Sequence, residues 1–297
     1  MNTNKIPAKI IVCNWAVVRS SVWLHMVELV DNMAPGKVKK VNGAQSIERA
    51  MTVLRAVAGA PQGATLSQVV TVSGLNKATV HRMLAVLTRE GLVQRNDEAK
   101  CYFLGEQLYA LGILAAPRYG LHQLAMPGLR RLAALSEDSS FLCLVSGNDV
   151  VCVHREEGSH PIRTHVMQVG IRYPIGVGSF GPAILAAMDD AQMERILTVN
   201  RRAYDNFDHY SVEEIRQLVK IARTKGYSVN PGWVYPESYG LAVAGLDERD
   251  QPVGALSIGA VASRLQPDRQ PKLAAALKAE AQGLTKQLRS LRAKVAP

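Results

Sequence analysis

Apolar residues recur three and four positions apart in two neighbouring stretches of the chain, with a glycine between them. Leu66, Val69 and Val70 form the stripe of the first stretch, and Ser73-Gly74-Leu75 interrupts it. The second stretch opens at Asn76, a favourable N-cap, and its apolar positions are Val80, Met83, Leu84 and Leu87. Since this spacing brings apolar side chains to one side of a helix, the pattern predicts two short helices joined by a tight turn.

A β-hairpin is predicted directly after the second helix. Gly91 ends that helix, residues 92–95 and 100–104 have the composition of strands, and residues 96–99 form a polar turn between them. Two short helices followed by a hairpin wing are the elements of a winged helix-turn-helix, whose second helix fits the major groove of DNA. The same elements also occur in proteins that contact no DNA, so the pattern alone leaves that alternative open.

Charge favours the DNA-binding interpretation. The chain has a formal net charge of +10, and residues 37–100 contain ten basic residues against four acidic ones. A basic surplus on such a motif attracts phosphates and gives salt-sensitive affinity. The predicted DNA contacts are therefore polar and basic residues of the second helix and the wing, together with one residue from the segment before the motif. They are Ser46, Asn76, Lys77, Thr79, His81, Arg82, Arg95 and Lys100.

Further helices and strands are predicted on both sides of the motif. Ser46 is expected to cap a helix that runs to about Ala58, and residues 106–114 and 121–135 have helical spacing after the wing. From residue 141 onward strands alternate with helices, which is typical of an α+β sensor domain. The predicted strands cover residues 141–145, 150–154, 163–169, 227–230, 241–246 and 253–261, and the predicted helices cover 180–188, 191–197, 212–225 and 271–294.

The length of 297 residues and a hydrophobic content of 47% suit two folded domains. We expect an N-terminal extension of undefined structure at 1–40, a DNA-binding domain at 41–105, a helical linker at 106–120 and an effector-binding domain at 121–297. Polar residues interrupt the apolar runs of the extension, so we expect neither a transmembrane helix nor a signal peptide there. The four scattered cysteines imply no disulfide framework, and a reducing cytoplasm is the expected location.

Several motifs carry a resemblance to a known family. In the N-terminal half they are Ser46 to Ala50, Gly74-Leu75 with Lys77 to Arg82, Glu90 to Val93, and Tyr102 with Leu104-Gly105. In the C-terminal half they are Gly170, Pro174, Gly181, Arg223, Gly226-Tyr227, Gly240 and Ala255 to Ser257. These motifs resemble those of the IclR family of bacterial transcriptional regulators. The resemblance implies a winged helix-turn-helix, a GAF-like effector-binding domain, operator DNA as partner, a homodimer or homotetramer, and no cofactor.

Residues 176–181 satisfy the pattern GxGxxG and precede a predicted helix. A dinucleotide site would need a surrounding βαβ unit, which the pattern does not show. We expect instead a loop whose amides hold an anion such as a carboxylate, with the turn-rich segment 230–237 beside it, although a structural turn and a surface loop remain alternatives. The predicted effector-binding residues are Gly176, Gly178, Ser179, Phe180, Asn230, Trp233 and Glu237.

Metal binding and catalysis are the remaining alternatives. Alternation places Cys152 and His154 on one strand face, where they could bind zinc with Cys143, but a fourth ligand is not evident and buried apolar cysteine is the simpler interpretation. Ser238 lacks the GxSxG context of a hydrolase nucleophile. We therefore expect no catalytic residues and no metal, in a DNA-binding regulator modulated by a small organic acid. The alternative is a metabolite-converting α+β enzyme domain fused to a DNA-binding module.

Overall fold

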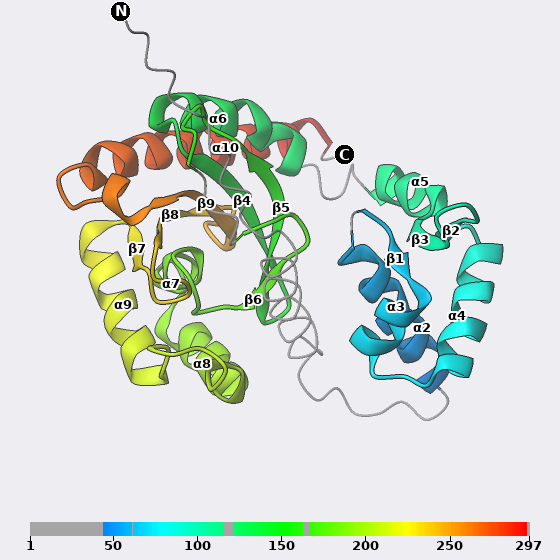
Figure 1. The fold of residues 1–297 in the computed structure, drawn as a ribbon. Helices are drawn as coiled ribbons and strands as arrows, with labels where there is room; N and C mark the ends of the chain where they lie inside the picture. Colours follow the sequence, from blue (N-terminus) through cyan, green and yellow to red (C-terminus); the bar gives the residue numbers. More distant parts are fainter. Residues whose placement is uncertain (1–43, 61, 116–120, 163–166, 296–297) are drawn as a thin grey trace, which may run out of the picture. The chain divides into compact units, whose positions relative to one another are not determined.

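The computed structural model describes residues 44–60, 62–115, 121–162 and 167–295 (Figure 1). These residues divide into two compact units, and the boundary lies between Gly105 and Glu106. Each unit buries its own set of apolar side chains. The predictions for the 1–40 extension and for linker residues 116–120 lie outside the described ranges.

The first unit packs three helices against a small antiparallel sheet. The helices are α2 (Gln45–Ala58), α3 (Leu66–Ser73) and α4 (Lys77–Arg89), and the strands are β1 (Ala64–Thr65), β2 (Val93–Asn96) and β3 (Cys101–Leu104), in the order β1-β3-β2. Val53 and Val57 of α2, Val69 of α3, and Val80 and Leu84 of α4 belong to the buried core. The predicted helix-turn-helix and hairpin are therefore confirmed.

Side-chain caps determine where α3 and α4 begin. Gln68 donates its backbone N–H to the Thr65 hydroxyl and accepts from the Thr65 N–H at 2.7 Å through its side-chain oxygen, which makes a capping box. Asn76 Oδ1 accepts from the Thr79 N–H at 2.8 Å. Gly74, with φ of +63°, ends α3 in the left-handed conformation that glycine adopts without strain. These signals keep the turn between the helices short.

The start of the first unit differs from the prediction in two respects. Ser46 does not cap α2, because the helix already begins at Gln45. Ala44 occupies the N-cap position, and its carbonyl accepts from the Glu48 N–H. Ser46 is exposed in the first turn. Strand β1 was not predicted, since its two residues, which pair with Tyr102 and Cys101, are too few for alternation to be recognised.

The second unit is an α+β domain built on a six-stranded antiparallel sheet in the order β6-β5-β4-β9-β8-β7. Its strands are β4 (Ser139–Ser146), β5 (Asp149–Glu156), β6 (Arg172–Pro174), β7 (Ser228–Pro231), β8 (Ser238–Leu246) and β9 (Pro252–Val261). Helix α5 (Glu106–Ala115) precedes this domain in the chain and buries none of its side chains.

Helices cover both faces of this sheet (Figure 1). One face carries α6 (Leu121–Ser136) and α10 (Gln270–Val295), and the other carries α7 (Phe180–Ala186), α8 (Asp190–Tyr204) and α9 (Val212–Lys225). The short helix η2 (Ala262–Arg264) joins β9 to α10. Nearly every side chain of α7 is buried, so packing on all sides holds the loop that leads into it.

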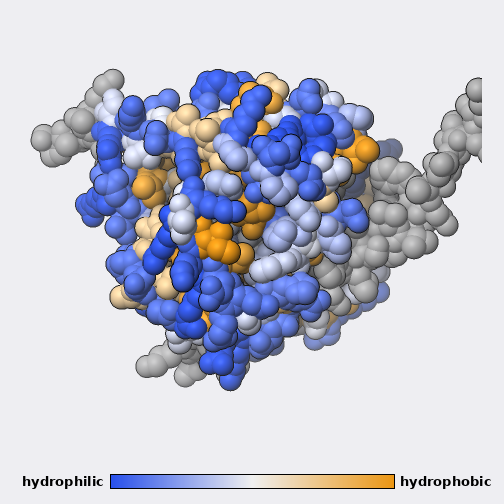
Figure 2. Space-filling view, turned by 90° about the vertical axis from the view of Figure 1, so that its left-hand side faces the viewer, coloured by the Kyte–Doolittle hydropathy of each residue, from blue (hydrophilic) through white to orange (hydrophobic). Residues whose placement is uncertain are grey.

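At the β7 edge of the sheet, part of β8 is paired only with β9, and the described residues place no strand on its outer side. Strand β7 pairs with β8 only as far as Ala242, and Val243, Ala244 and Leu246 beyond it line two hollows. Figure 2 looks toward this side and shows apolar surface, in orange, among hydrophilic side chains. This edge is accessible, in contrast to the central strands.

Two predicted elements of the second unit need correction. The prediction of a strand at 163–169 is wrong within the described residues. Residues 167–169 are not in a strand, and β6 begins only at Arg172. Helix α8 runs past its predicted end at Leu197, since Asn200 and Tyr204 continue its buried side and donate to the carbonyls of Asn148 and Ile175 at 2.7 and 2.5 Å. Counting apolar residues does not detect such buried polar positions.

Candidate functional site

Helix α4 presents polar side chains to solvent along one side. Lys77, His81 and Arg82 are exposed, whereas Val80 and Leu84 are buried beneath them. Within the described residues, neither Lys77 nor Arg82 takes part in an ion pair, so both charges are available to an anionic partner. The N-terminal half of α4 therefore offers two cations and an imidazole on a single surface.

Thr79 does not belong to this surface. Its side chain is only 5% exposed, and the Asn76 cap binds its backbone N–H. The prediction that Thr79 faces outward is wrong, because helical geometry turns it toward the packed side of α4. The exposed side of α4 instead consists of residues three or four positions apart. These residues are Ala78, His81, Arg82 and Ala85. Ala78 was missed because a small apolar residue carries no polar signal.

The wing places two further basic residues beside its turn. Arg95 Nε lies 2.9 Å from Asp97 Oδ1, an ion pair whose side chains are both largely exposed and which therefore adds little stability. Lys100 is exposed and has a φ of +51°, a left-handed conformation that the turn imposes on a residue with a side chain. Both cations are accessible, and Arg95 can exchange Asp97 for another anion.

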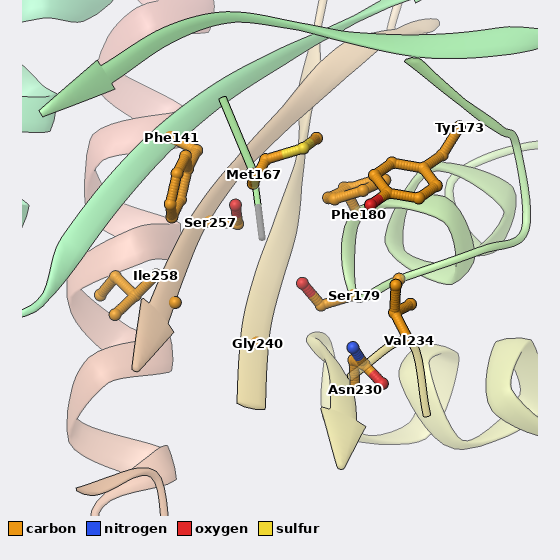
Figure 3. A pocket seen from close by; sticks show the side chains of 12 residues that line it. Phe141, Met167, Tyr173, Ser179, Phe180, Asn230, Val234, Gly240, Ser257 and Ile258 are labelled. Atoms are coloured by element: carbon orange, nitrogen blue, oxygen red, sulfur yellow. The ribbon is translucent and has the colours of Figure 1, made fainter. Parts of the chain in front are cut away.

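A second candidate site is a cavity in the α+β domain, between β4, β8 and β9 on one side and the loop before α7 on the other (Figure 3). Its empty volume is about 450 Å³, part of which is open to solvent. Apolar and aromatic side chains form most of the wall: Phe141, Met167, Tyr173, Phe180, Val234 and Ile258. The polar side chains at the cavity are Ser179, Asn230 and Ser257.

Asn230 is oriented by its neighbours. Its Oδ1 accepts from Tyr210 Oη at 3.3 Å and from the Trp233 backbone N–H at 2.9 Å. These two donors fix the orientation of the amide, so the Nδ2 group points toward Ser179 and the cavity (Figure 3). Ser179 and Ser257 are each 4% exposed, and no hydrogen bond joins either hydroxyl to another described residue. The cavity therefore offers an amide donor and two unpaired hydroxyls.

Among the described residues that line the cavity, none carries a charged side chain. Burial raises the pKa of Tyr173 well above its ordinary value, and the neighbouring Tyr235 adds to that effect. Burial also raises the pKa of Tyr210, so both phenols stay protonated near neutral pH. The described lining therefore offers a ligand dipoles and apolar contact.

Of the residues predicted to bind the effector, Gly178, Ser179, Phe180 and Asn230 line this cavity, and three others do not. Gly176, with φ of +126°, packs its backbone against Tyr204 and Ile215 instead. Trp233 makes an edge-to-face contact with Tyr210, with ring centroids 5.6 Å apart, and Glu237 is exposed at the surface.

The loop before α7 has less anion-binding capacity than predicted. The Gly178 N–H donates to Tyr210 Oη at 3.1 Å and is not available to a ligand. Phe141, Tyr173 and Ser257 were not predicted as cavity residues. The available signal was strand alternation, which places Phe141 and its cross-strand partner Ser257 on one face of the sheet.

The three residues considered for zinc do not converge. Cys143 is paired with Cys152, and Leu142 with His154, because a bulge leaves Val153 as an extra residue in β5. The bulge reverses the alternation, so Cys152 and His154 lie on opposite faces, and the prediction of a shared face is wrong. The described residues contain no group of three or more ligating side chains suited to a metal.

Comparisons with known families bear on both sites. The model of the IclR helix-turn-helix domain matches residues 46–97, and the model described as Bacterial transcriptional regulator IclR C-terminal matches residues 114–286. The chain belongs to the IclR family of bacterial transcriptional regulators. In this IclR-family protein, α4 and the first strand of the wing, β2, lie within the helix-turn-helix match, and the described cavity residues lie within the C-terminal match.

Individual relatives agree with this assignment. The glycerol operon regulatory protein of Streptomyces coelicolor is 28% identical over 246 residues, which are 82% of this chain and 96% of the relative. An IclR regulator from Alicyclobacillus acidocaldarius superposes with a TM-score of 0.68 at 26% identity, covering 82% of this chain and 98% of that one. An IclR homologue from Microbacterium hydrocarbonoxydans, solved with 4-hydroxybenzoate, superposes with a TM-score of 0.68 at 22% identity. The match covers 82% of this chain and 99% of the homologue. No helix in the described ranges has the length and apolar character needed to cross a membrane.

Proposed function

We propose that this IclR-family regulator reads its operator with the exposed side of α4 and with the wing. The observation that carries the proposal is the exposure of Lys77, His81 and Arg82 on the N-terminal half of α4, the part of a recognition helix that reaches base edges. Asn76 and Ser46 are exposed as well, and Arg95 and Lys100 are positioned to contact phosphates. We propose a cytoplasmic location, because the proposed partner is operator DNA.

We further propose that the effector is a small organic acid bound in the cavity. Asn230 offers two N–H donors and no acceptor, so it selects a ligand group that accepts hydrogen bonds. The Ser179 and Ser257 hydroxyls add two further donors, and donors of this kind stabilise a carboxylate without a cation. The aromatic wall, including Phe141 and Tyr173, fits a flat or short apolar body.

The active form is proposed to be a homodimer or a homotetramer. Tyr109 and Leu114 of α5 are 76% and 78% exposed, and Leu111 and Ile113 are more than half exposed. An apolar helix without buried side chains favours association with a second copy, which would also supply the second recognition helix. An effector that stabilises one arrangement of the two helices over another then changes operator affinity.

Two binding experiments test this function. An operator is first selected from a random-sequence duplex library by repeated binding to the full chain. Small organic acids, with their amides as uncharged controls, are then screened for an upward shift of the melting temperature and for a change in affinity for the selected duplex. Failure to enrich any sequence would refute the DNA-reading role, and stabilisation by amides but not by acids would refute the carboxylate.

The regulator is proposed to leave its ligand chemically unchanged. No side chain at the cavity combines a nucleophile with a base, since the described lining contains neither histidine nor a carboxylate. Prolonged incubation with the acid that shifts the melting temperature, followed by mass spectrometry, should recover that acid intact. Turnover above the rate in buffer would establish the alternative, an enzyme domain fused to a DNA-binding module.

A further inference from the structure

A chain of ionisable side chains joins α6 to β5 on the face of the sheet opposite the cavity. Nε2 of His122, in the first turn of α6, lies 3.0 Å from Nδ1 of His154 in β5. Nε2 of His154 lies 3.3 Å from Oε2 of Glu156, and Nε of Arg130 lies 3.8 Å from the same carboxylate oxygen. The side chains of His154 and Glu156 are 17% and 30% exposed, so these contacts are largely shielded from solvent.

Few arrangements of protons satisfy this chain. Two ring nitrogens 3.0 Å apart need one N–H donor and one lone pair. Glu156 favours a proton on Nε2 of His154, which leaves Nδ1 as the acceptor and makes Nε2 of His122 the donor. A further proton on Nδ1 of His154 removes the acceptor, and with both rings charged two cations would face each other.

We propose that the His122–His154 contact makes the effector domain sensitive to pH, so that acidification opens the contact between α6 and β5 and lowers operator affinity. Among the described residues, the charged groups beside the pair are Arg130 on α6 and Glu156 on β5, and Glu280 on α10 is bound by Arg131 of α6 at 2.7 Å. Glu156 neutralises one added charge on the pair and no more. The second proton is therefore the one that separates the rings.

The contact is connected to the effector cavity through one strand. His154 is paired with Leu142 of β4, and Leu142 adjoins Phe141, which lines the cavity from the other face. Leu142 also packs in the core that Leu129 and Leu132 of α6 help to form. Movement of α6 away from β5 therefore disturbs the strand that carries the cavity wall.

The direction of the pH effect follows from the protonation of His122. Burial and the neighbouring His154 lower the pKa of His122 from its ordinary value. The folded protein therefore binds fewer protons than the unfolded chain as the pH falls through the ordinary histidine pKa of about 6.5. The free energy of unfolding is undiminished above that pH and decreases below it.

His122→Gln is the test of the contact. The glutamine amide can donate to a neutral His154 or, turned over, accept from a protonated one, and it does not titrate. The urea midpoint of the full chain is measured at pH 7.5 and pH 5.5. We expect a larger acid-induced drop for the wild type than for His122→Gln, and a wild-type drop for the control His160→Gln in the same domain, whose ring contacts the Ile162 backbone.

Operator binding tests the regulatory consequence. Affinity for the selected duplex is measured at pH 7.5 and pH 6.0, and the ratio of the two values is compared between wild type and His122→Gln. His81 on α4 is present in both proteins, so its contribution cancels. We expect the wild type to lose severalfold more affinity. Equal acid-induced drops in the urea midpoint, or equal affinity ratios, in the two proteins would overturn the proposal.

Discussion

Thr79 and His81 are two positions apart on α4, yet one is buried and the other exposed. Both are small or medium polar residues, so residue type alone could not separate them, and the sequence prediction placed both on the DNA-facing side. The cap at Asn76 fixes where the helix begins, and helical geometry then decides which side chains turn outward. Only the outward-facing residues can read bases, and this distinction leads to the first prediction.

His81→Ala should change which operator bases are preferred, whereas Lys77→Ala should weaken all duplexes alike and reduce the salt slope of binding by about 1. The reason is that base contacts specify sequence, at about 1–3 kcal/mol per good pair, while phosphate contacts do not. Gel-shift titrations on matched and single-mismatch operators at several salt concentrations measure both effects. Thr79→Val serves as the control and should leave base preference unchanged.

In the cavity, Asn230→Asp should abolish binding of an acidic effector. The new carboxylate can still accept from Tyr210 and Trp233, so the local fold is kept, but it cannot donate and it repels an anion. Loss of a charge-assisted hydrogen bond alone corresponds to roughly 10- to 100-fold weaker binding. Calorimetry with the identified acid checks this. Unchanged affinity, with operator binding intact, would mean that the acid binds elsewhere.

At the scale of elements, the sequence predicted most helices and strands, because their apolar spacing is regular. Helix α9 has the bounds that its capping serine and following glycine indicate. The failures have local physical causes: β1 is too short to alternate, and the bulge at Val153 shifts every later residue of β5 to the other face. The cavity could be predicted only in part, since strands far apart in the sequence contribute Phe141 and Ser257.

Asn76→Ala should lower the free energy of unfolding by about 1 kcal/mol, the usual value of an N-cap hydrogen bond. Asn76 is exposed, so this change removes the bond to the Thr79 N–H without creating a cavity. Urea denaturation of the full chain measures the effect, and Asn76→Ser, which preserves a cap, is the matched variant. A serine variant as unstable as the alanine variant would show that the cap does not hold α4.

At the scale of the whole molecule, α5 is the element that the single chain leaves unexplained. The apolar spacing predicts this helix, yet it buries no side chain within the described residues, so packing in that part of the chain does not account for its stability. Periodicity could predict that this helix exists. The homodimer or homotetramer expected from the family resemblance has no counterpart in the apolar spacing, which does not say what covers a helix surface.

Leu111→Glu with Leu114→Glu should reduce association of the chain and weaken operator binding. Two carboxylates on an apolar helix surface oppose its burial against another copy, and a monomer contacts one half-site in place of two. Sedimentation velocity and gel-shift titration give the two readouts. Glu106→Gln, at the polar start of the same helix, is the control and should keep the wild-type mass. A double variant with that mass would exclude α5 from the interface.

Gly181 touches Gly176 backbone to backbone, and a side chain at Gly181 would bring its first carbon within 2.4 Å of the Gly176 nitrogen. A contact of this kind tolerates no substitution, so the loop that carries Ser179 cannot drift as the protein diverges. Met167 and Val234, by contrast, line the cavity with side chains (Figure 3). Duplicated copies of this gene that acquire new effectors should therefore change at Met167 and Val234 long before they change at either glycine. Effector specificity would then evolve around a fixed contact between two glycines.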